Sequence, residues 1–193
     1  MHFPIIVVGE DVEGQLAPFQ ENNMGDCPDK YLEKDDEGNT YNPNAMWDWY
    51  VIGGRWSGGF KLKPNKKGFC QPEILPGNRR KNFPNGVDSA IKGDIDFEGI
   101  KQYRIKLANK IWTRFMCKDN KYIRLTDEMR LCNKLGISPN ETKSAFITRI
   151  SSYHYHHIVW RDEWFGELSE KEYDKKLKEI GDKELLTIVD CHI

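Results

Sequence analysis

Residues 47–60 read WDWYVIGGRWSGGF and gather the residue types that bind a phosphate-bearing ligand. Gly53 and Gly54 allow a turn with positive φ, which can expose backbone N–H groups. The guanidinium of Arg55 can hold a phosphate through two parallel hydrogen bonds. Tryptophan rings stack on nucleobases. The sequence therefore predicts a nucleotide or a nucleic-acid fragment as ligand, with the binding residues Trp47, Trp49, Gly53, Gly54, Arg55, Trp56 and Ser57.

The same stretch permits two other interpretations. In the first, it is a tight hairpin at a corner of the core, with the tryptophans buried and Arg55 packed over a ring. Strand alternation would then place Trp47 and Trp49 on one face, and Asp48 and Tyr50 on the other. In the second, the stretch docks on another protein, because tryptophan and arginine are common hot-spot residues of interfaces. It is not a P-loop, since the pattern GxxxxGK[ST] is absent.

A second group of candidates lies near the two ends of the chain. Glu10 and Asp11 follow a first apolar segment, whereas Asp190 and His192 lie two residues apart at the end of a last one. If these segments form parallel strands, the four side chains meet at one sheet edge. Carboxylates and an imidazole could there bind a divalent metal and act as the catalytic residues of a phosphodiester hydrolase. If the strands are antiparallel, His192 lies near His2 and far from Glu10.

Two further segments carry histidine or cysteine. In YHYHH, His154 and His156 would share one face of a strand and could bind a metal, while exposed histidines without a role are the alternative. Cys191 precedes His192, but neighbouring strand residues point to opposite faces, so we expect a buried and unreactive thiol. The five cysteines are odd in number and lack CxxC spacing, which indicates reduced thiols in a cytoplasmic protein.

The elements that must position these residues begin and end with apolar runs. Residues 3–8 and 185–189 are continuously apolar rather than alternating, which is typical of strands buried on both faces. We therefore expect the two terminal strands to be central, and adjacent or separated by one strand. The prediction is a single α+β domain of residues 1–193. It has one mixed or mostly antiparallel sheet covered by two to three helices, and a ferredoxin-like variant is one candidate.

Between the terminal strands, helices and hairpins follow without strict βαβ alternation. Helices are predicted at residues 13–20, 96–115, 126–135 and 169–180, and hairpins at 50–62 and at 146–150 with 153–160. Residues 63–93 are rich in proline and glycine, and we expect an irregular insertion there. Ser169 and Glu172 form a capping box in the last helix. One buried stripe is predicted along the long helix: Ile100, Tyr103, Leu107 and Ile111.

Composition limits the classes of partner. The net charge of -1 and the pI near 6.5 argue against binding of bulk duplex nucleic acid through electrostatics. No apolar run approaches the length of a membrane span, so no membrane partner is expected. The partners that remain are a small phosphate-bearing ligand or a protein.

The segments WDWYVIGGRWSG, KGDIDFEG (residues 92–99) and the terminal VDCHI resemble a family of small proteins from bacteriophages and bacterial genomes. The start of the chain, HFPIIVVGEDVEGQLAPFQENNMGDCP, fits the same pattern. The resemblance implies a setting, the cytoplasm of a phage-infected or prophage-bearing host cell. It implies no activity and no catalytic residue.

The sequence thus predicts a phage-type cytoplasmic protein that binds a phosphate-containing ligand and could be a metal-assisted phosphodiester hydrolase. The alternative is a non-enzymatic interaction protein, such as an inhibitor of a host defence complex. A structural scaffold without a small-molecule site is the third interpretation.

Overall fold

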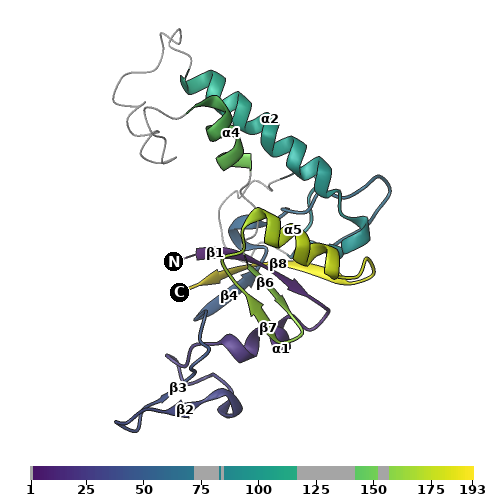
Figure 1. The fold of residues 1–193 in the computed structure, drawn as a ribbon. Helices are drawn as coiled ribbons and strands as arrows, with labels where there is room; N and C mark the ends of the chain where they lie inside the picture. Colours follow the sequence, from purple (N-terminus) through teal and green to yellow (C-terminus); the bar gives the residue numbers. More distant parts are fainter. Residues whose placement is uncertain (1, 72–82, 84, 117–141, 152–156) are drawn as a thin grey trace. The chain divides into compact units, whose positions relative to one another are not determined.

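The computed structural model describes residues 2–71, 83, 85–116, 142–151 and 157–193 (Figure 1). The chain divides into two compact units, the first made of Met1–Asp96 with Tyr155–Ile193 and the second of Phe97–His154. The prediction that the whole chain forms a single domain stays a prediction. The elements of the first unit are β1 (His2–Val8), α1 (Val12–Leu16), η1 (Ala17–Phe19), η2 (Asp29–Tyr31), β2 (Glu33–Lys34), β3 (Thr40–Tyr41), β4 (Trp49–Ile52), η3 (Gly54–Trp56), β5 (Ser89–Ile91), η4 (Lys92–Asp94), β6 (His157–Trp160), β7 (Glu163–Phe165), α5 (Glu170–Glu179) and β8 (Leu185–His192).

A mixed sheet of six strands forms the first unit, in the order β4-β8-β1-β6-β7, with β5 also paired to β8. β1 and β8 are antiparallel neighbours, from His2 opposite His192 to Val8 opposite Leu186. β6 lies parallel to β1 on its other side, and β4 and β5 both run antiparallel to β8. This arrangement confirms the α+β class and the central, adjacent position of the two terminal strands.

Both faces of the central strands are buried, as their continuous apolarity predicted. On one face a core cluster gathers residues of the strands with residues of α1 and η1. Its fully or almost fully buried members are Ile5, Val7, Leu16, Phe19, Trp47, Val159, Val189 and Cys191. On the other face Ile6 lies opposite Ile158 and Ile188, and all three are fully buried. Each such side chain contributes roughly 1.5–3 kcal/mol through burial. Figure 1 draws α1 and α5 on opposite sides of this sheet.

α5 confirms the prediction made from its cap. The Ser169 side chain accepts from the backbone N–H of Glu172, and the Glu172 side chain accepts from the backbone N–H of Ser169. The helix buries Tyr173 and Leu177, which lie one turn apart, and Ile180 is buried directly after its end.

The predicted hairpin at residues 146–150 and 153–160 is wrong in its first half. Lys143–Ser151 forms helix α4, because Thr142 caps its start: the Ala145 N–H donates to Thr142 Oγ1 and the Phe146 N–H to the Thr142 carbonyl. The observed hairpin lies one element later and joins β6 to β7. Its two turn residues, Arg161 and Asp162, both have positive φ, as in the type I′ turns that match strand twist.

In the second unit, α2 (Phe97–Met116) contacts α4. The predicted stripe on α2 is wrong in part, since Tyr103 and Leu107 are both 43% exposed. The buried centre is Ala108, and the Trp112 ring packs 5.4 Å from that of Phe146. A small residue at the contact shifted the buried face, whereas the prediction counted only large apolar residues. The helix predicted at residues 126–135 lies outside the described residues.

The predicted hairpin at residues 50–62 is also corrected. β4 is present and a turn follows it, but Phe60 and Leu62 form bridges to Val87 and Ile95 instead of returning to β4. Where residues 63–93 are described, they contain the three-residue strand β5 and the start of η4, in agreement with the expected lack of a long regular element. β5 nevertheless joins the central sheet by pairing with β8.

Candidate functional site

The Gly53-Gly54 turn has the positive φ that the sequence predicts, with values of 73° and 48°. Each glycine also faces a buried aspartate. A Cβ on Gly53 would lie 2.6 Å from the Asp88 carboxylate, and one on Gly54 would lie 2.4 Å from the Cβ of Asp190. Glycine is therefore needed at both positions for two reasons, the positive φ of the backbone and the lack of space for a Cβ.

The chain's own carboxylates occupy the backbone donors around this turn. Asp88 is fully buried and accepts from the backbone N–H of Gly58 at 2.6 Å and of Gln71 at 3.0 Å, and from the Ser57 hydroxyl at 3.2 Å. Asp190 Oδ2 accepts from the Arg55 N–H at 2.9 Å. The N–H groups of Trp56 and Ser57 donate to carbonyls of the turn itself. A phosphate at this turn would therefore have to be held by the Arg55 side chain rather than by a nest of amides.

The tryptophans of the opening stretch have different surroundings. Trp47 is buried in the core, its Nε1 donates to the Leu16 carbonyl at 3.0 Å, and its ring meets Tyr50 edge-on. It cannot stack on a ligand. Trp49 is 41% exposed on the opposite face of the sheet, because β4 begins only at Trp49 and the chain changes phase at Asp48. The predicted sharing of one face by Trp47 and Trp49 is wrong for that reason. Trp56 is half-buried in η3.

Arg55 meets the sequence expectation in one respect. Its side chain is exposed, and within the described residues its guanidinium has no hydrogen bond and no ion pair. The backbone of the same residue is anchored on Asp190. The backbone of Arg55 is thus fixed, and its guanidinium is available to an anion.

Three rings, one each from β4, β8 and β1, lie in mutual contact. Trp49 lies opposite His192, and His192 lies opposite His2, in the strand registers. Trp49 stacks on His192 with 5.2 Å between ring centroids. The rings of His2 and His192 meet edge to face with 4.8 Å between their centroids. His2 also meets Trp49 at 5.1 Å. With Asp48 and Asp190 these rings form what we call the terminal-strand cluster: His2, Asp48, Trp49, Asp190 and His192.

The two histidines of this cluster are each paired with a carboxylate. His2 Nδ1 lies 2.8 Å from Asp190 Oδ1, and His192 Nδ1 lies 2.9 and 3.0 Å from the two oxygens of Asp48. The Asp190 side chain is 3% exposed and that of His2 14%, whereas Asp48 and His192 are 19% and 31% exposed. One pair is therefore nearly buried and the other more open.

A carboxylate at Nδ1 fixes what the other ring nitrogen can do. An ionised carboxylate only accepts, so each Nδ1 carries the proton, and in the neutral ring Nε2 is then the basic atom. Within the described residues neither Nε2 has a hydrogen-bond partner, and neither is among the buried atoms that lack one, so both reach solvent. Partial burial raises the pKa of Asp48. Hydrogen bonds from His192 and from the Trp49 N–H, together with the charge of His192, lower this pKa by more than burial raises it, so the net shift is downward.

The four-residue cluster predicted from sequence does not assemble, because its condition of parallel strands is not met. β1 and β8 are antiparallel, so Glu10 and Asp11 follow the end of β1 that pairs with the start of β8, while His192 lies opposite His2. Asp11 instead caps α1 by accepting from the Gly14 N–H at 2.8 Å. Over the described ranges, no group of three or more His, Cys, Asp or Glu side chains could hold a metal ion.

Two other sequence candidates have plain outcomes. His154 and His156 lie outside the described residues. Cys191 is fully buried, as predicted, and burial raises the pKa of its thiol far above the usual range, which disfavours the reactive thiolate. The residues that sequence reasoning did not assign to the site are His2 and Asp48. The antiparallel alternative stated from the sequence did place His192 near His2, and it is the one observed.

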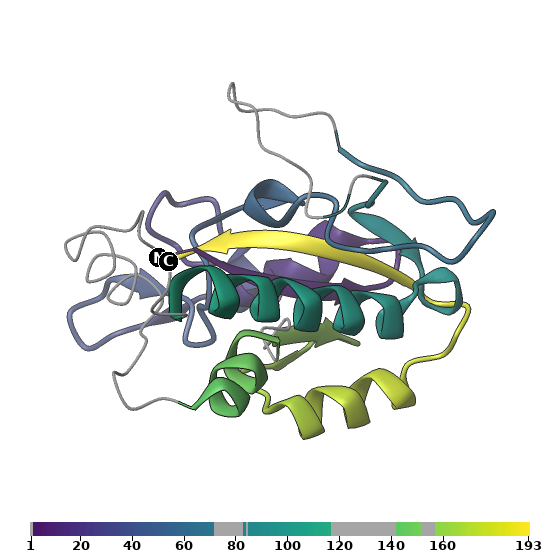
Figure 2. The same cartoon turned by 90° about the horizontal axis from the view of Figure 1, so that it is seen from above.

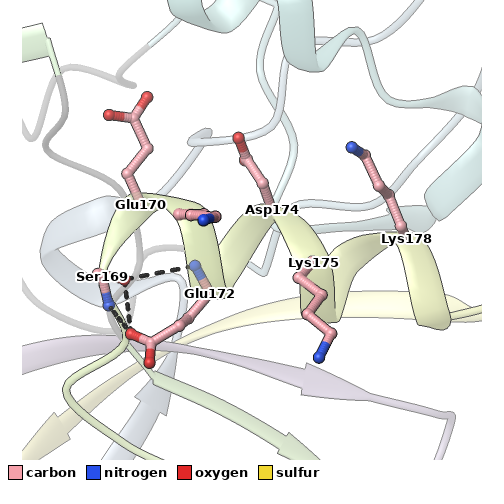
Figure 3. A pocket seen from close by; sticks show the side chains of 7 residues that line it. Ser169, Glu170, Glu172, Asp174, Lys175 and Lys178 are labelled. Atoms are coloured by element: carbon pink, nitrogen blue, oxygen red, sulfur yellow. Dashed lines mark hydrogen bonds between the residues drawn. The ribbon is translucent and has the colours of Figure 1, made fainter.

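A shallow pocket along α5 offers no comparable chemistry (Figure 3). Its lining residues are exposed and carry both charges, and the Ser169 and Glu172 side chains already bond to each other. Glu170, Asp174 and Lys178 point away from the side chain of Lys175, so the charged groups do not converge on one point. The lining residues are Ser169, Glu170, Lys171, Glu172, Asp174, Lys175 and Lys178.

Comparisons of the chain with protein-family models, with curated proteins and with solved structures gave no match. Within the described ranges, no helix combines the length and the apolar character needed to cross a bilayer.

Proposed function

We propose that the protein binds a phosphodiester ligand, a nucleic-acid fragment, at the terminal-strand cluster and cleaves it by acid–base catalysis. The observation that carries the proposal is the contact of two carboxylate-paired histidines, His2 and His192, with ring centroids 4.8 Å apart. One ring in the neutral form can take a proton while the other, protonated, gives one. General acid–base groups of this kind contribute about 10²–10⁴-fold to a rate.

Neighbouring residues supply the binding functions that such a reaction needs. The ring of Trp49 contacts both imidazoles, and its exposed part can stack on a base. Arg55 can bind the phosphate. Asp190 holds the backbone of Arg55 close to His2, because one of its oxygens accepts from the Arg55 N–H and the other from His2 Nδ1.

The test uses asparagine at each histidine position. Asparagine keeps a nitrogen near the place of Nδ1, so the bond to aspartate can persist, but it removes Nε2. We expect His2→Asn and His192→Asn each to lower the cleavage of a mixture of RNA and DNA oligonucleotides at least about 100-fold. The melting temperature should change little.

Glu10→Gln separates this site from the metal cluster predicted from sequence. The proposal expects an unchanged rate, since Glu10 lies at the far end of β1. A large loss with Glu10→Gln and full activity of both asparagine variants would reject the acid–base pair.

A second candidate is the non-enzymatic interaction protein, such as a phage-encoded inhibitor of a host defence complex. Four exposed apolar side chains from residues 24–49 favour it: Met24, Tyr41, Met46 and Trp49. Exposed apolar groups gathered in one segment are typical of protein interfaces. This candidate expects binding to a partner to depend on these residues and to survive His2→Asn. The host-cell cytoplasm remains the proposed setting for both candidates.

A further inference from the structure

We infer that the substrate class is single-stranded RNA and that the nucleophile is the ribose 2′-hydroxyl of the substrate itself. This inference rests on the proposed function and specifies it. It depends on which side chains around the terminal-strand cluster can still bind a ligand and which already bond to other groups of the protein.

Both carboxylates of the cluster are committed to orienting other groups. Asp190 uses one oxygen for His2 Nδ1 and the other for the Arg55 N–H. Asp48 directs both oxygens at His192 Nδ1, and its Oδ1 also accepts from the Trp49 N–H at 2.7 Å. The open groups of the cluster are the two imidazole Nε2 atoms, and the side chain of Arg55, whose backbone is bonded to Asp190, adds an exposed guanidinium. Such a set moves protons and stabilises negative charge.

RNA is the phosphodiester that such a set suits best, because it carries its own nucleophile next to the phosphorus. A DNA diester would need a water molecule placed and activated from outside. In the step that follows from the geometry, one neutral imidazole takes the proton of the 2′-hydroxyl, and the 2′-oxygen forms a bond to phosphorus. The bond from phosphorus to the 5′-oxygen breaks, and the second imidazole, in its protonated form, gives that oxygen a proton. The products are a 2′,3′-cyclic phosphate and a free 5′-hydroxyl, with no other reactant consumed.

The position of Trp49 favours an unpaired strand. Its ring is stacked on His192 with an interplanar angle of 17° and is still 41% exposed. A base must leave a duplex before it can stack on a side chain, and stacking on tryptophan tolerates any base. The net charge of -1 likewise disfavours the long basic surface that duplex binding uses. We therefore expect cleavage of single strands with weak sequence preference.

The experiment compares three oligonucleotides of one sequence: all-deoxy, with a single ribonucleotide, and with a 2′-O-methyl group at that nucleotide. The protein carries no terminal tag, because both chain ends lie beside the cluster (Figures 1 and 2). Mass spectrometry of the products should show cleavage only after the ribonucleotide, with a cyclic phosphate on one fragment. Reaction in the presence of a chelator should be unchanged.

The outcomes separate the inference from the proposed function. Equal cleavage of the all-deoxy strand would overturn the inference and leave the acid–base site in place, and so would hydrolysis of bis(p-nitrophenyl) phosphate without cleavage at the ribose. Failure on every substrate would overturn both. His2→Asn and His192→Asn, purified in the same way, must each lose at least about 100-fold. Full activity in these variants would identify a contaminating ribonuclease and overturn the inference.

Discussion

The turn after β4 and the terminal-strand cluster are both organised by aspartate side chains that accept hydrogen bonds, and Asp190 belongs to both regions. In the turn, buried carboxylates accept from backbone amides that are fixed and fully used. In the cluster, carboxylates accept from imidazoles, which have a second nitrogen left over. A carboxylate that accepts only from backbone N–H groups stabilises the fold. A carboxylate that accepts from one nitrogen of an imidazole also orients the second nitrogen, which can bind another group. The turn therefore stabilises the fold, and the cluster is the proposed site of chemistry.

The largest expected effect tests the turn. Gly53→Ala should lower the free energy of unfolding by roughly 3 kcal/mol or more, because it adds a Cβ against the Asp88 carboxylate at positive φ. Gly25 is a matched control, since it has the same φ of 73° but nothing within 4 Å of an added Cβ. Gly25→Ala should cost only about 1 kcal/mol. Urea denaturation measures both, and equal losses would show that Asp88 does not restrict the turn.

Removing the buried carboxylate should have the next largest effect. Asp88→Ala leaves two backbone N–H groups without this acceptor and removes the bond from the Ser57 hydroxyl, at a cost of about 2–4 kcal/mol. Asp35 makes a useful contrast, because it also accepts two backbone N–H groups but lies exposed in the turn between β2 and β3. Asp35→Ala should cost about 1 kcal/mol or less, since water replaces the lost acceptor. A loss at Asp35 as large as that at Asp88 would contradict the role given to burial.

Arg55 tests the boundary between the two regions. Arg55→Ala should change the free energy of unfolding by less than about 0.5 kcal/mol, because the side chain is exposed and the anchored group is the backbone. It should weaken ligand binding by about tenfold, and Arg55→Lys should recover only part of this, since lysine lacks the bidentate fork. Thermal melts with and without an oligonucleotide give both quantities. If both variants melt several degrees lower without ligand, Arg55 belongs to the structural turn instead.

The smallest expected effect concerns pH. Because the pKa of Asp48 is lowered in the folded protein, its pair with His192 stabilises the fold above the pKa of an unfolded aspartate. That contribution should be lost as pH falls through the folded-state pKa. The pair is partly exposed, so the difference between the parent protein and Asp48→Asn should be less than about 1 kcal/mol. Unfolding measured from about pH 7 down to about pH 3 should show the two curves converging. Curves that diverge toward acid pH would have the wrong sign.

Local signals in the sequence were sufficient for part of the fold. The continuous apolar runs of β1 and β8 predicted central strands, and the capping box of Ser169 predicted α5, because burial and capping depend on neighbouring residues. The phase of α2 was missed because a small residue, Ala108, lies at the contact. The β6–β7 hairpin was misplaced because its turn residues are Arg161 and Asp162 rather than asparagine and glycine.

The site was harder to predict because its geometry depends on contacts between distant parts of the chain. The direction of β8 relative to β1 decided whether His192 would meet Glu10 or His2, and no local pattern determines that direction. The aspartates that fill the donors around Gly53-Gly54 come from residues 88 and 190, far along the sequence. The sequence shows the residue types of an anion site, but which partners would occupy their donors first depended on the tertiary fold.

The pairing of β8 with β1, β4 and β5 has a consequence for the order of events during translation. β8 is the last of these strands to leave the ribosome, and β1 and β4 must wait for it before the sheet can close. Non-local pairing of this kind also makes folding slow. His2 therefore acquires its aspartate, and its partner ring, only when synthesis has passed His192. Both histidine–carboxylate pairs, His2 with Asp190 and His192 with Asp48, can thus form only after β8 has been made.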